Sequence, residues 1–425
     1  MKKLFALLLS ATMALSLVAC SSSTTTESTT TTTTTTTEAA TTEAVEATGI
    51  AASDIKIGAI LVHDENSGYD LAHIEGIEAA CANLGIDLSQ VTFKYNIPED
   101  ETCYDTAADL ADAGCDIIFS DSYGHQTYMQ QAASEFADVT FVACTGDTAA
   151  TSGLSNLHNI FPYTYESRYV SGIVAGMKLA ELMDAGTVTD PKIGYVGAYP
   201  YAEVVSGYTA FLLGIQSIVP EAYMEVQFTN SWFDLVAEGE CANALIATGC
   251  VIIGQHADST GAPSAVQAAY DAGTVVYSVG YNIDMTAVAP DAALTSAQNV
   301  WAVLYQATLE TLMSGEAVPA DYACGIADGA TAISALGASC ADGSQEAADA
   351  AFAAIADGSL QVFDTTTFTV GGEEVTSAMA LDTDGDWVND SAEAIYDGAF
   401  HESVHRSAPY FALGIDGITL LTSEA

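Results

Sequence analysis

The stretch Gly249-Cys250-Val251-Ile252-Ile253-Gly254-Gln255-His256-Ala257-Asp258 is a short apolar run that opens onto polar residues. Gly261-Ala262-Pro263 and an Ala-rich helical pattern follow it. A run of this kind before a loop and a helix is typical of a buried parallel strand, and open α/β sheets bind ligands where such strands end. A matching phrase, Gly114-Cys115-Asp116-Ile117-Ile118-Phe119-Ser120-Asp121, occurs 135 residues earlier. The strand and its loop are therefore predicted twice.

Three further pairs of short segments repeat at nearly the same spacing, between 131 and 136 residues. They are Lys56-Ile57-Gly58 with Lys192-Ile193-Gly194, Glu75-Gly76-Ile77 with Ser206-Gly207-Tyr208, and Thr140-Phe141-Val142 with Thr274-Val275-Val276. Four pairs in the same order indicate a duplicated βαβαβαβ unit. The chain is therefore predicted to form two similar α/β lobes whose loops face each other across a cleft.

The predicted strands and helices divide the chain after its first 53 residues into two lobes and a tail. The ranges are 54–163 plus 282–319 for lobe one, 164–281 plus 320–364 for lobe two, and 365–425 for a β-like tail. The chain is expected to cross between the lobes three times, at the helix that begins near Tyr165, at Tyr281–Met285 and near Ala320. Glu166 and Arg168, at the first crossing, are expected to form a structural pair.

The N-terminus carries a targeting signal. Lys2 and Lys3 precede an apolar run that is too short and too interrupted for a membrane span, which indicates a secretory signal over residues 1–20. Leu17-Val18-Ala19-Cys20 resembles the bacterial lipobox, which predicts cleavage before Cys20 and attachment of lipid to its thiol. Acyl chains would hold the protein on the extracytoplasmic face of the cell membrane. An ordinary exported protein is the alternative. The Thr-rich segment 21–53 lacks aromatic residues and is predicted to be a disordered tether.

The charge balance restricts the class of partner. The chain has 56 acidic and 8 basic residues, and its formal net charge is −48. A surface with this excess of acidic residues repels nucleic acid. Few lysine and arginine side chains are available to neutralise a multiply phosphorylated ligand. The cargo is therefore expected to be neutral or cationic, and no nucleic-acid partner is expected.

Eight cysteines remain after Cys20, which is an even number. Outside the cytoplasm this permits disulfides, although eight cysteines allow 105 connectivities. The pairs Cys103/Cys115 and Cys241/Cys250 occupy equivalent places in the two repeats. Buried free thiols are the alternative. No C-x-x-C sequence occurs, so neither a zinc ribbon nor a thioredoxin-type motif is supported.

Two short segments near the C-terminus match metal-binding patterns. His401-Glu402-Ser403-Val404-His405 fits H-E-x-x-H, whose two histidines bind zinc from adjacent turns of a helix. A zinc-dependent surface hydrolase is therefore an alternative function. However, Gly398 and Pro409 leave little room for a helix, so coincidence is the preferred interpretation. A second segment places acids where calcium loops have them, at Asp382, Asp384, Asp386, Asp390 and Glu393. Calcium in the tail and a solvated acidic turn both remain open.

Five ordered motifs make the chain similar to the basic membrane protein family of solute-binding lipoproteins. They are Tyr165-Glu166-Ser167-Arg168-Tyr169, Lys192-Ile193-Gly194-Tyr195-Val196-Gly197, Thr229-Asn230-Ser231-Trp232-Phe233-Asp234, Gln255-His256-Ala257-Asp258-Ser259 and Val279-Gly280-Tyr281-Asn282-Ile283-Asp284-Met285. The resemblance spans about 55–364. It implies a type I periplasmic-binding fold, with two Rossmann-like lobes and a hinge of three crossovers, in a protein that is not an enzyme and requires no cofactor.

The same resemblance implies a small-molecule ligand and an ABC permease as partners. Family members deliver purine nucleosides or nucleobases to ABC importers, and some relatives take other ligands such as flavins. The first loop, His63-Asp64-Glu65, is unusually polar for the family, so another neutral ligand, flavin or sugar-like, stays open.

A purine is a flat ring with donors and acceptors on its edge, so its site needs aromatic faces and a few fixed polar groups. Trp232 and Tyr69 are the expected stacking residues, and Asp258 and Asp284 are expected to accept hydrogen bonds from the ligand. Asp121 is a weaker candidate. The complete predicted ligand-binding set is Tyr69, Ser122, Tyr123, Gly197, Trp232, His256, Asp258, Gly280 and Asp284. The two glycines belong to this set because a glycine lets the backbone approach a ligand closely.

Overall fold

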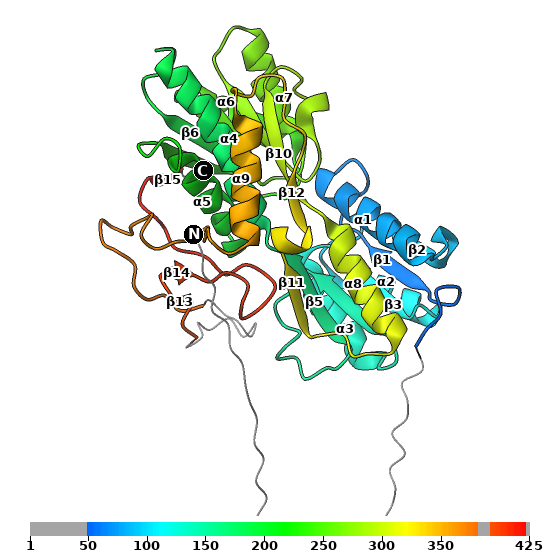
Figure 1. Cartoon of the computed structure of the whole chain (residues 1–425). Coiled ribbons are helices and arrows are strands. Elements are labelled where there is room, and N and C mark those ends of the chain that lie inside the picture. Colours follow the sequence, from blue (N-terminus) through cyan, green and yellow to red (C-terminus); the bar gives the residue numbers. More distant parts are fainter. Residues whose placement is uncertain (1–48, 381–391, 422–425) are drawn as a thin grey trace, which may run out of the picture. The chain divides into compact units, whose positions relative to one another are not determined.

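Two β-sheets, each with helices on both faces, form the framework of the protein (Figure 1). The computed structural model describes residues 49–380 and 392–421. The first sheet has the strand order β11-β5-β4-β3-β1-β2, with β1 (Ile57–Ile60), β2 (Val91–Lys94), β3 (Ile117–Ser120), β4 (Thr140–Cys144), β5 (Leu157–Pro162) and β11 (Asp321–Cys324). The second has the order β12-β10-β9-β8-β6-β7-β15, with β6 (Lys192–Gly197), β7 (Tyr223–Phe228), β8 (Ile252–Gln255), β9 (Tyr277–Tyr281), β10 (Ala293–Asn299), β12 (Thr331–Ile333) and β15 (Ile418–Leu421). We call the first sheet with its helices lobe one and the second lobe two.

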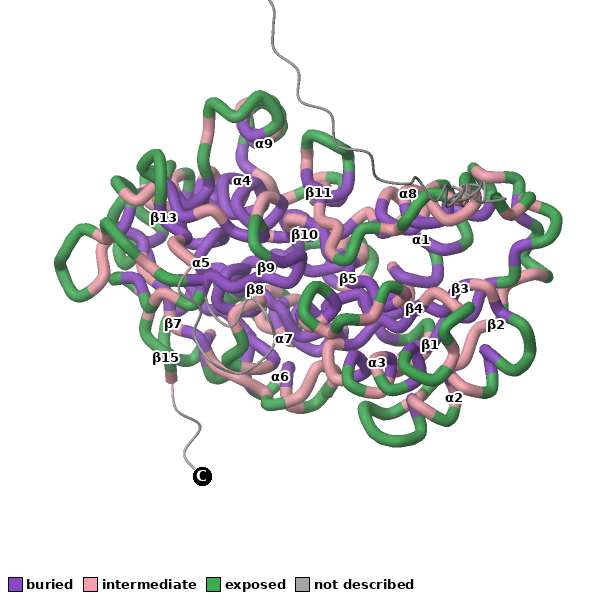
Figure 2. The backbone as a smooth tube through the Cα atoms, turned by 90° about the horizontal axis from the view of Figure 1, so that it is seen from below, coloured by how far each residue is buried: buried purple, intermediate pink, exposed green. Residues whose placement is uncertain are grey.

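The helices shield both sheets from solvent, and the backbone of the strands between them is largely buried (Figure 2). Lobe one has α1 (Gly68–Leu84) and α8 (Trp301–Ser314) on one face and α2 (Glu101–Asp112) and α3 (Gln126–Glu135) on the other. Lobe two has α4 (Thr164–Asp184), α5 (Ala202–Gln216) and α9 (Ser344–Ala356) on one side, with α6 (Leu235–Ala247) and α7 (Gly261–Asp271) on the opposite side. Among the described residues, no helix is both long and apolar enough to cross a membrane.

The predicted duplication is confirmed by the strand order. Strands β2-β1-β3-β4-β5 of lobe one recur as β7-β6-β8-β9-β10 in lobe two, and neighbours within each set are parallel. The two repeated strands of the opening phrase, β3 and β8, are buried along their whole length. Because helices cover both faces of the sheet, such strands need apolar side chains on both faces, which produces the unbroken apolar runs.

Side-chain caps determine where two helices beside the cleft begin. The Ser67 side chain accepts a hydrogen bond from the N–H of Asp70 at the start of α1, and α1 ends at Gly85, whose φ is 71°. The Asp234 carboxylate accepts hydrogen bonds from the N–H groups of Val236 and Ala237 at the start of α6. The first N–H groups of a helix have no partner within it, so these caps stabilise the helix starts.

The sequence analysis predicts the wrong position for the second crossing between the lobes. Strand β10 pairs with β9, so residues 282–299 belong to lobe two, and the chain returns to lobe one only at α8. Tyr281–Met285 is therefore not a crossing. The strand was overlooked because it is rich in polar residues. Buried Thr295 donates from its hydroxyl to the carbonyl of Ser334 over 3.0 Å, and the N–H of Ser296 donates to the Ser334 hydroxyl over 2.8 Å.

The third crossing lies between β11 and β12, a few residues beyond the predicted position near Ala320. The expected pair of Glu166 and Arg168 is also corrected. Glu166 accepts a hydrogen bond from the N–H of Ile326 over 2.6 Å, whereas Arg168 donates to the carbonyl of Gln255 over 2.6 Å. Residues two apart on a helix point in different directions, which is why these two side chains find separate partners.

The C-terminal tail packs on lobe two. Strand β15 extends the second sheet beside β7, and β13 (Ile395–Tyr396) pairs with β14 (Ala399–Phe400) in a small hairpin. Phe363 stacks on Phe411 with ring centres 4.2 Å apart, inside the core of lobe two. The predicted calcium ligands Asp382, Asp384, Asp386 and Asp390 lie outside the described residues. Glu393 is described, and it accepts hydrogen bonds from the Ser377 hydroxyl and the Ala378 N–H.

The folded part of the chain begins slightly earlier than predicted. Ile50 packs against the core of lobe one, and its N–H donates to the carbonyl of Met313 over 3.0 Å. The last residues assigned to the tether therefore belong to lobe one. The signal segment, Cys20 and the rest of the tether lie outside the described residues.

The cysteines of the lobes do not form disulfides. All eight described cysteines are free thiols, including both predicted pairs, Cys103/Cys115 and Cys241/Cys250. Seven are buried, and they pack as small apolar side chains. Burial raises the pKa of the Cys241 thiol to about 11, so this group stays protonated at neutral pH.

Candidate ligand-binding site

A pocket lies where the carboxyl ends of the two sheets meet. Eleven residues line it: Val62, Tyr69, Asp121, Ser122, Tyr123 and Thr145 from lobe one, and Glu203, Trp232, His256, Asp258 and Tyr281 from lobe two. Asp121 and Ser122 directly follow β3, and His256 and Asp258 follow β8. The repeated sequence phrase thus supplies part of both walls.

Backbone hydrogen bonds fix the strand-end loops of the two walls. In lobe one the Asp121 N–H donates to the carbonyl of Ile60 over 3.2 Å. In lobe two the Asp258 N–H donates to the carbonyl of Trp232 over 2.8 Å, which joins two of the pocket-lining segments. The polar side chains at the strand ends therefore project from a backbone that is itself held by the sheet.

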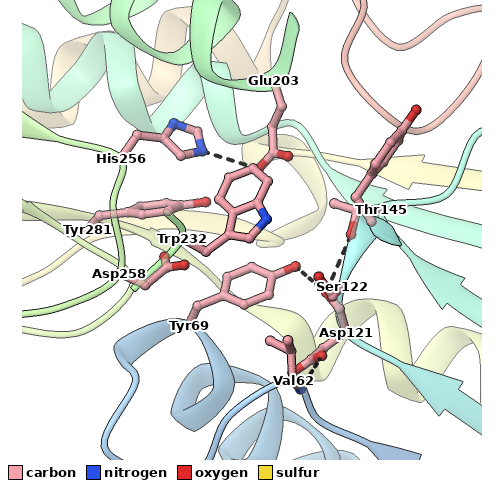
Figure 3. Close-up of a pocket in the computed structure, with 11 residues that line it drawn as sticks. Val62, Tyr69, Asp121, Ser122, Thr145, Glu203, Trp232, His256, Asp258 and Tyr281 are labelled. Atoms are coloured by element: carbon pink, nitrogen blue, oxygen red, sulfur yellow. Dashed lines mark hydrogen bonds and ion pairs between the residues drawn. The ribbon is translucent and has the colours of Figure 1, made fainter. Parts of the chain in front are cut away.

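Three aromatic rings point into the pocket, from Tyr69, Trp232 and Tyr281 (Figure 3). The Tyr69 hydroxyl donates to the carbonyl of Asp121 over 2.8 Å, and its ring meets His73 edge-on with centroids 4.5 Å apart. The Tyr281 ring has the guanidinium of Arg168 on one face, 3.7 Å from its centroid. Both rings are therefore held in fixed orientations before any ligand arrives.

Trp232 reaches the pocket from the loop between β7 and α6. Its indole is half-buried and lies edge-on to Tyr199, with ring centroids 5.1 Å apart. Tyr199 in turn stacks on Tyr201 at 5.2 Å. Figure 3 shows the indole between the Glu203 carboxylate and the Tyr69 ring. The indole therefore packs against an aromatic cluster of Tyr199 and Tyr201.

Acidic groups dominate the electrostatics of the pocket. Asp121, Glu203 and Asp258 line it, and no lysine or arginine is among the eleven lining residues. Asp258 is 7% exposed, and burial raises its pKa well above the ordinary range. One of its oxygens accepts a hydrogen bond from the Asn282 amide over 3.1 Å. Such a site favours ligands that donate hydrogen bonds and disfavours anions.

His256 is neutral in this environment because burial lowers its pKa. Its Nε2 lies 3.2 Å from a Glu203 carboxylate oxygen, to which it donates. A Cβ added at Gly207 of α5 would lie 2.9 Å from His256 Nδ1, so the glycine makes room for the imidazole. The equivalent glycine of the first repeat, Gly76 of α1, makes room for the Trp301 side chain, which a Cβ would approach to 2.6 Å.

The two walls touch around the pocket. The Gly68 N–H at the start of α1 donates to the carbonyl of Asp258 over 3.2 Å. The rings of His63 and Phe233 lie 5.5 Å apart, and those of Tyr123 and Tyr201 lie 6.3 Å apart. The lobes are therefore in a closed arrangement in which residues from both surround the same space.

The family model described as ABC transporter substrate-binding protein PnrA-like, Bmp, matches residues 25–347. The chain belongs to this family. A purine-binding protein of Brucella abortus (strain 2308) is 33% identical over 266 residues, which are 62% of this chain and 71% of the relative. A putative ABC transporter glucose-binding protein of Haloferax volcanii is 37% identical over 205 residues, or 48% of each chain. The predicted family membership is confirmed.

Solved structures share the fold of this Bmp-family protein. A solute-binding protein of an ABC transporter system from Aeropyrum pernix K1 has a TM-score of 0.62 at 15% identity, covering 73% of this chain and 93% of its own. A solute-binding protein from Conexibacter woesei has a TM-score of 0.56 at 22% identity, covering 72% and 98%. The predicted α/β type I periplasmic-binding fold is confirmed. The protein is an extracytoplasmic substrate-binding component of an ABC transporter, not an enzyme.

The structure brings six of the nine predicted residues of this Bmp-family protein to the pocket: Tyr69, Ser122, Tyr123, Trp232, His256 and Asp258. The other three lie elsewhere. A Cβ at Gly197 would lie 2.8 Å from the Phe228 ring, and one at Gly280 would lie 2.5 Å from Met285, so both glycines serve packing within lobe two. Asp284 accepts a hydrogen bond from the N–H of Thr286 and caps a short 3₁₀ turn.

Apart from the weaker candidate Asp121, four lining residues are absent from the predicted set: Val62, Thr145, Glu203 and Tyr281. Val62 and Thr145 follow β1 and β4, so their position at a strand end was a usable signal. Glu203 lies in the first turn of α5, just after Tyr199-Pro200-Tyr201 at the end of β6. Its approach to the pocket depends on how the loop folds back, which the local sequence does not indicate.

The zincin pattern does not form a zinc site. Residues 401–405 are not helical, and Ser403 between the two histidines has a φ of 59°. His401 stacks on Tyr396, with ring centroids 3.6 Å apart, and Glu402 accepts hydrogen bonds from the N–H groups of Tyr410 and Phe411. Within the described part of the chain, no group of three or more His, Cys, Asp or Glu is arranged to hold a metal ion.

Proposed function

We propose that this substrate-binding protein takes a purine nucleoside or nucleobase into the pocket between its lobes and passes it to an ABC permease, while lipid on Cys20 holds it at the membrane. The observation that carries the ligand class is one pocket that combines the rings of Tyr69, Trp232 and Tyr281 with the carboxyl groups of Glu203 and Asp258. Aromatic faces suit a flat heterocycle, and carboxylates suit its N–H groups or the hydroxyls of a ribose.

Asp258 is the best-placed acceptor for a ring N–H or a hydroxyl. Its side-chain oxygens offer acceptor positions, and the Asn282 amide uses only one of them. The acidity of the pocket also agrees with a ligand that carries no phosphate, because each phosphate would face Asp121, Glu203 and Asp258 without a compensating cation in the lining. A nucleoside or base is therefore favoured over a nucleotide.

The two relatives support different ligands. The Brucella abortus relative is named as a purine-binding protein, and it aligns over a larger share of both chains. The Haloferax volcanii relative is named as a putative glucose-binding protein of an ABC transporter. A sugar-like ligand is the second candidate, because aromatic faces beside carboxylates also suit a hydroxyl-rich ring.

Isothermal titration of the purified protein decides between these ligands. Guanosine, adenosine, hypoxanthine, riboflavin and glucose are titrated separately, after unfolding and refolding to remove any ligand carried through purification. Saturable 1:1 binding of a purine compound, with glucose and riboflavin inert, supports the proposal. Binding of glucose or riboflavin without any purine overturns the purine assignment. Mass spectrometry of ligand released from natively purified protein provides an independent identification.

A further inference from the structure

The C-terminal tail extends beyond the family model, which ends at residue 347, and it is anchored on lobe two. Phe363 and Phe411 stack inside the core of that lobe. Buried Glu402 accepts backbone hydrogen bonds from Tyr410 and Phe411, which closes residues 402–411 into a loop. This loop is therefore a fixed part of lobe two.

The same loop reaches lobe one at two points. Arg406 Nη1 lies 3.0 Å from Asp147 Oδ2 in a salt bridge whose side chains are only 7% and 3% exposed. The N–H and the hydroxyl of Ser407 both donate to Asp321 Oδ1, over 2.8 and 2.7 Å. Asp147 follows β4 and Asp321 begins β11, and both strands belong to the sheet of lobe one. The tail thus connects the two lobes outside the three crossovers of the chain.

Arg406 is held in position for this contact. Its Nε donates to the carbonyl of Ala408 and its Nη2 to the carbonyl of Pro409, which fixes the plane of the guanidinium. On the other side, the Asp147 N–H donates to the side chain of Gln126 over 2.8 Å. A buried pair with both partners preorganised loses little further entropy when it forms, and separating it exposes two charges that must be solvated separately.

Asp147 links this contact to the pocket. The oxygen that pairs with Arg406 also accepts a hydrogen bond from the Tyr123 hydroxyl over 2.7 Å. Tyr123 lines the pocket, and its ring faces Tyr201 of lobe two across a centroid distance of 6.3 Å. A chain of contacts therefore runs from the tail through Arg406 and Asp147 to a residue that touches the ligand space.

We propose that residues 402–411 form a latch across the lobes, in which Arg406 is a positioning residue that acts through Asp147 to hold Tyr123 against the pocket. The latch favours the closed arrangement and so slows release of the ligand. The inference rests on the proposed function, because it takes the ligand to lie in this pocket. Since the contact forms between lobes, its loss shifts the balance toward the open arrangement without changing the groups that line lobe two.

The first test measures ligand release by stopped-flow displacement of guanosine. Arg406→Gln and Asp147→Asn are each expected to speed dissociation by about tenfold or more while association changes by less than about threefold, because truncating a buried charge pair acts mainly on dissociation. The double variant should release guanosine no faster than the faster of the two single variants. Arg406→Lys should release it more slowly than Arg406→Gln.

Lys192→Gln is the matched control, since the Lys192–Glu225 pair, at 3.0 Å, lies within lobe two. Parental dissociation rates in both Arg406→Gln and Asp147→Asn overturn the latch.

The second test does not depend on the ligand. Small-angle X-ray scattering of the ligand-free protein reports the separation of the lobes, and Arg406→Gln should give a larger radius of gyration than the parent, whereas Lys192→Gln should not. Equal radii for the parent, Arg406→Gln and Asp147→Asn overturn the latch. If the parent fails to bind guanosine, the purine assignment is at fault, and the scattering comparison still decides whether the tail holds the lobes together.

Discussion

Asn282 donates from its side-chain amide to Asp258 over 3.1 Å, and both residues are almost completely buried in the wall of the pocket. Asn282 adopts a left-handed backbone with a φ of 63°, a conformation that asparagine tolerates better than most residues. Its backbone N–H donates to the carbonyl of Ala297, so β10 fixes its position. The Asp258 carboxylate is thus aimed by a residue from the neighbouring strand end, before any ligand is bound.

Replacing Asp258 by asparagine should weaken purine binding. Replacing the group that accepts a hydrogen bond from a buried donor leaves that donor unsatisfied, which costs about 1–3 kcal/mol, or about 5- to 150-fold in affinity. Asp284→Asn is the matched control, because Asp284 caps a 3₁₀ turn and does not line the pocket. Calorimetric titration with guanosine measures both variants. Equal losses in the two variants, or none in Asp258→Asn, would contradict the assigned role of Asp258.

Removal of the Trp232 indole should weaken binding without unfolding the protein. Stacking of a base on an aromatic side chain is worth about 1–3 kcal/mol, or about 5- to 150-fold in affinity. Trp232 is half-buried and packs on Tyr199 and Tyr201, so Trp232→Ala should lower the melting temperature by only a few degrees. Trp232→Phe keeps a stacking face and should retain most of the affinity. Parental affinity of Trp232→Ala for guanosine, adenosine and hypoxanthine would show that the stacking surface lies elsewhere.

The predicted lipid anchor is tested by replacing Cys20. Cys20→Ala should leave the precursor uncleaved or release the protein from the membrane fraction, because attachment of lipid to the thiol requires the cysteine. Fractionation of cells followed by mass spectrometry of the N-terminal peptide measures both outcomes. Normal membrane retention and normal processing of Cys20→Ala would contradict the lipobox prediction and favour an ordinary exported protein.

The sequence predicted the framework because the relevant physics is local. Strands β3 and β8 are buried on both faces, so each appears as an unbroken apolar run, and the repeat doubles the signal. Strand β10 lies in the range 282–319 that the sequence analysis places in lobe one, because Thr295 and Ser296 interrupt its apolar character and hide the strand. Their polar groups bond Ser334, which lies nearly 40 residues later in the chain, and no local pattern indicates this partner.

The same limit applies to the pocket. Tyr69 and Asp258 follow strand ends, and their positions could be inferred from the order of the strands. Gly197 is also at a strand end, but a Cβ there would meet the Phe228 ring, so the position faces the core of lobe two and not the cleft. Whether a residue at a strand end points to the ligand or to a helix depends on the twist of the sheet and the packing of the next element. Neither the twist of the sheet nor the packing of the next element can be inferred from a single sequence.

Buried Glu402 should make the free energy of unfolding depend on pH. A single substitution, Glu402→Gln, can isolate its contribution. Burial raises the pKa of Glu402 from 4.5 to about 7, so the folded state favours the protonated form. The stability that this preference contributes is present below about pH 4.5 and is lost as the pH rises to about 7. Buried histidines such as His73, whose pKa is lowered to about 3, act in the opposite direction below about pH 6.5, so the parent alone is not informative.

The informative quantity is therefore the difference in melting temperature between Glu402→Gln and the parent. Glutamine does not titrate, so the variant does not lose this contribution as the pH rises. The melting temperature of the variant minus that of the parent should therefore increase between pH 5 and pH 8, even if it is negative at pH 5. Differential scanning fluorimetry across this range measures it. A difference that stays constant with pH would show that Glu402 ionises in the folded protein as it does in the unfolded chain.

Gly207→Ala should weaken ligand binding, because the added methyl group would displace the His256 side chain in the pocket wall. The added Cβ would lie 2.9 Å from His256 Nδ1, and His256 donates from Nε2 to Glu203 on the pocket wall. Alanine is otherwise favoured over glycine inside a helix by about 1 kcal/mol, so any loss must come from displacement of the imidazole. The variant should bind guanosine more weakly. The expected loss in affinity is about tenfold, which corresponds to about 1.4 kcal/mol of binding free energy.

Gly239→Ala provides the matched control for this substitution. Gly239 also lies within a helix, α6, but a Cβ there would meet only the backbone of Gly261, at an ordinary contact distance of 3.5 Å. This control should gain stability from the better helix former and leave guanosine binding unchanged. If Gly207→Ala behaves in the same way, the imidazole has room to move, and the equivalent glycines of the two repeats reflect common descent more than a present need for space. If only Gly207→Ala loses affinity, the close approach of α5 to His256 is part of what shapes the ligand site.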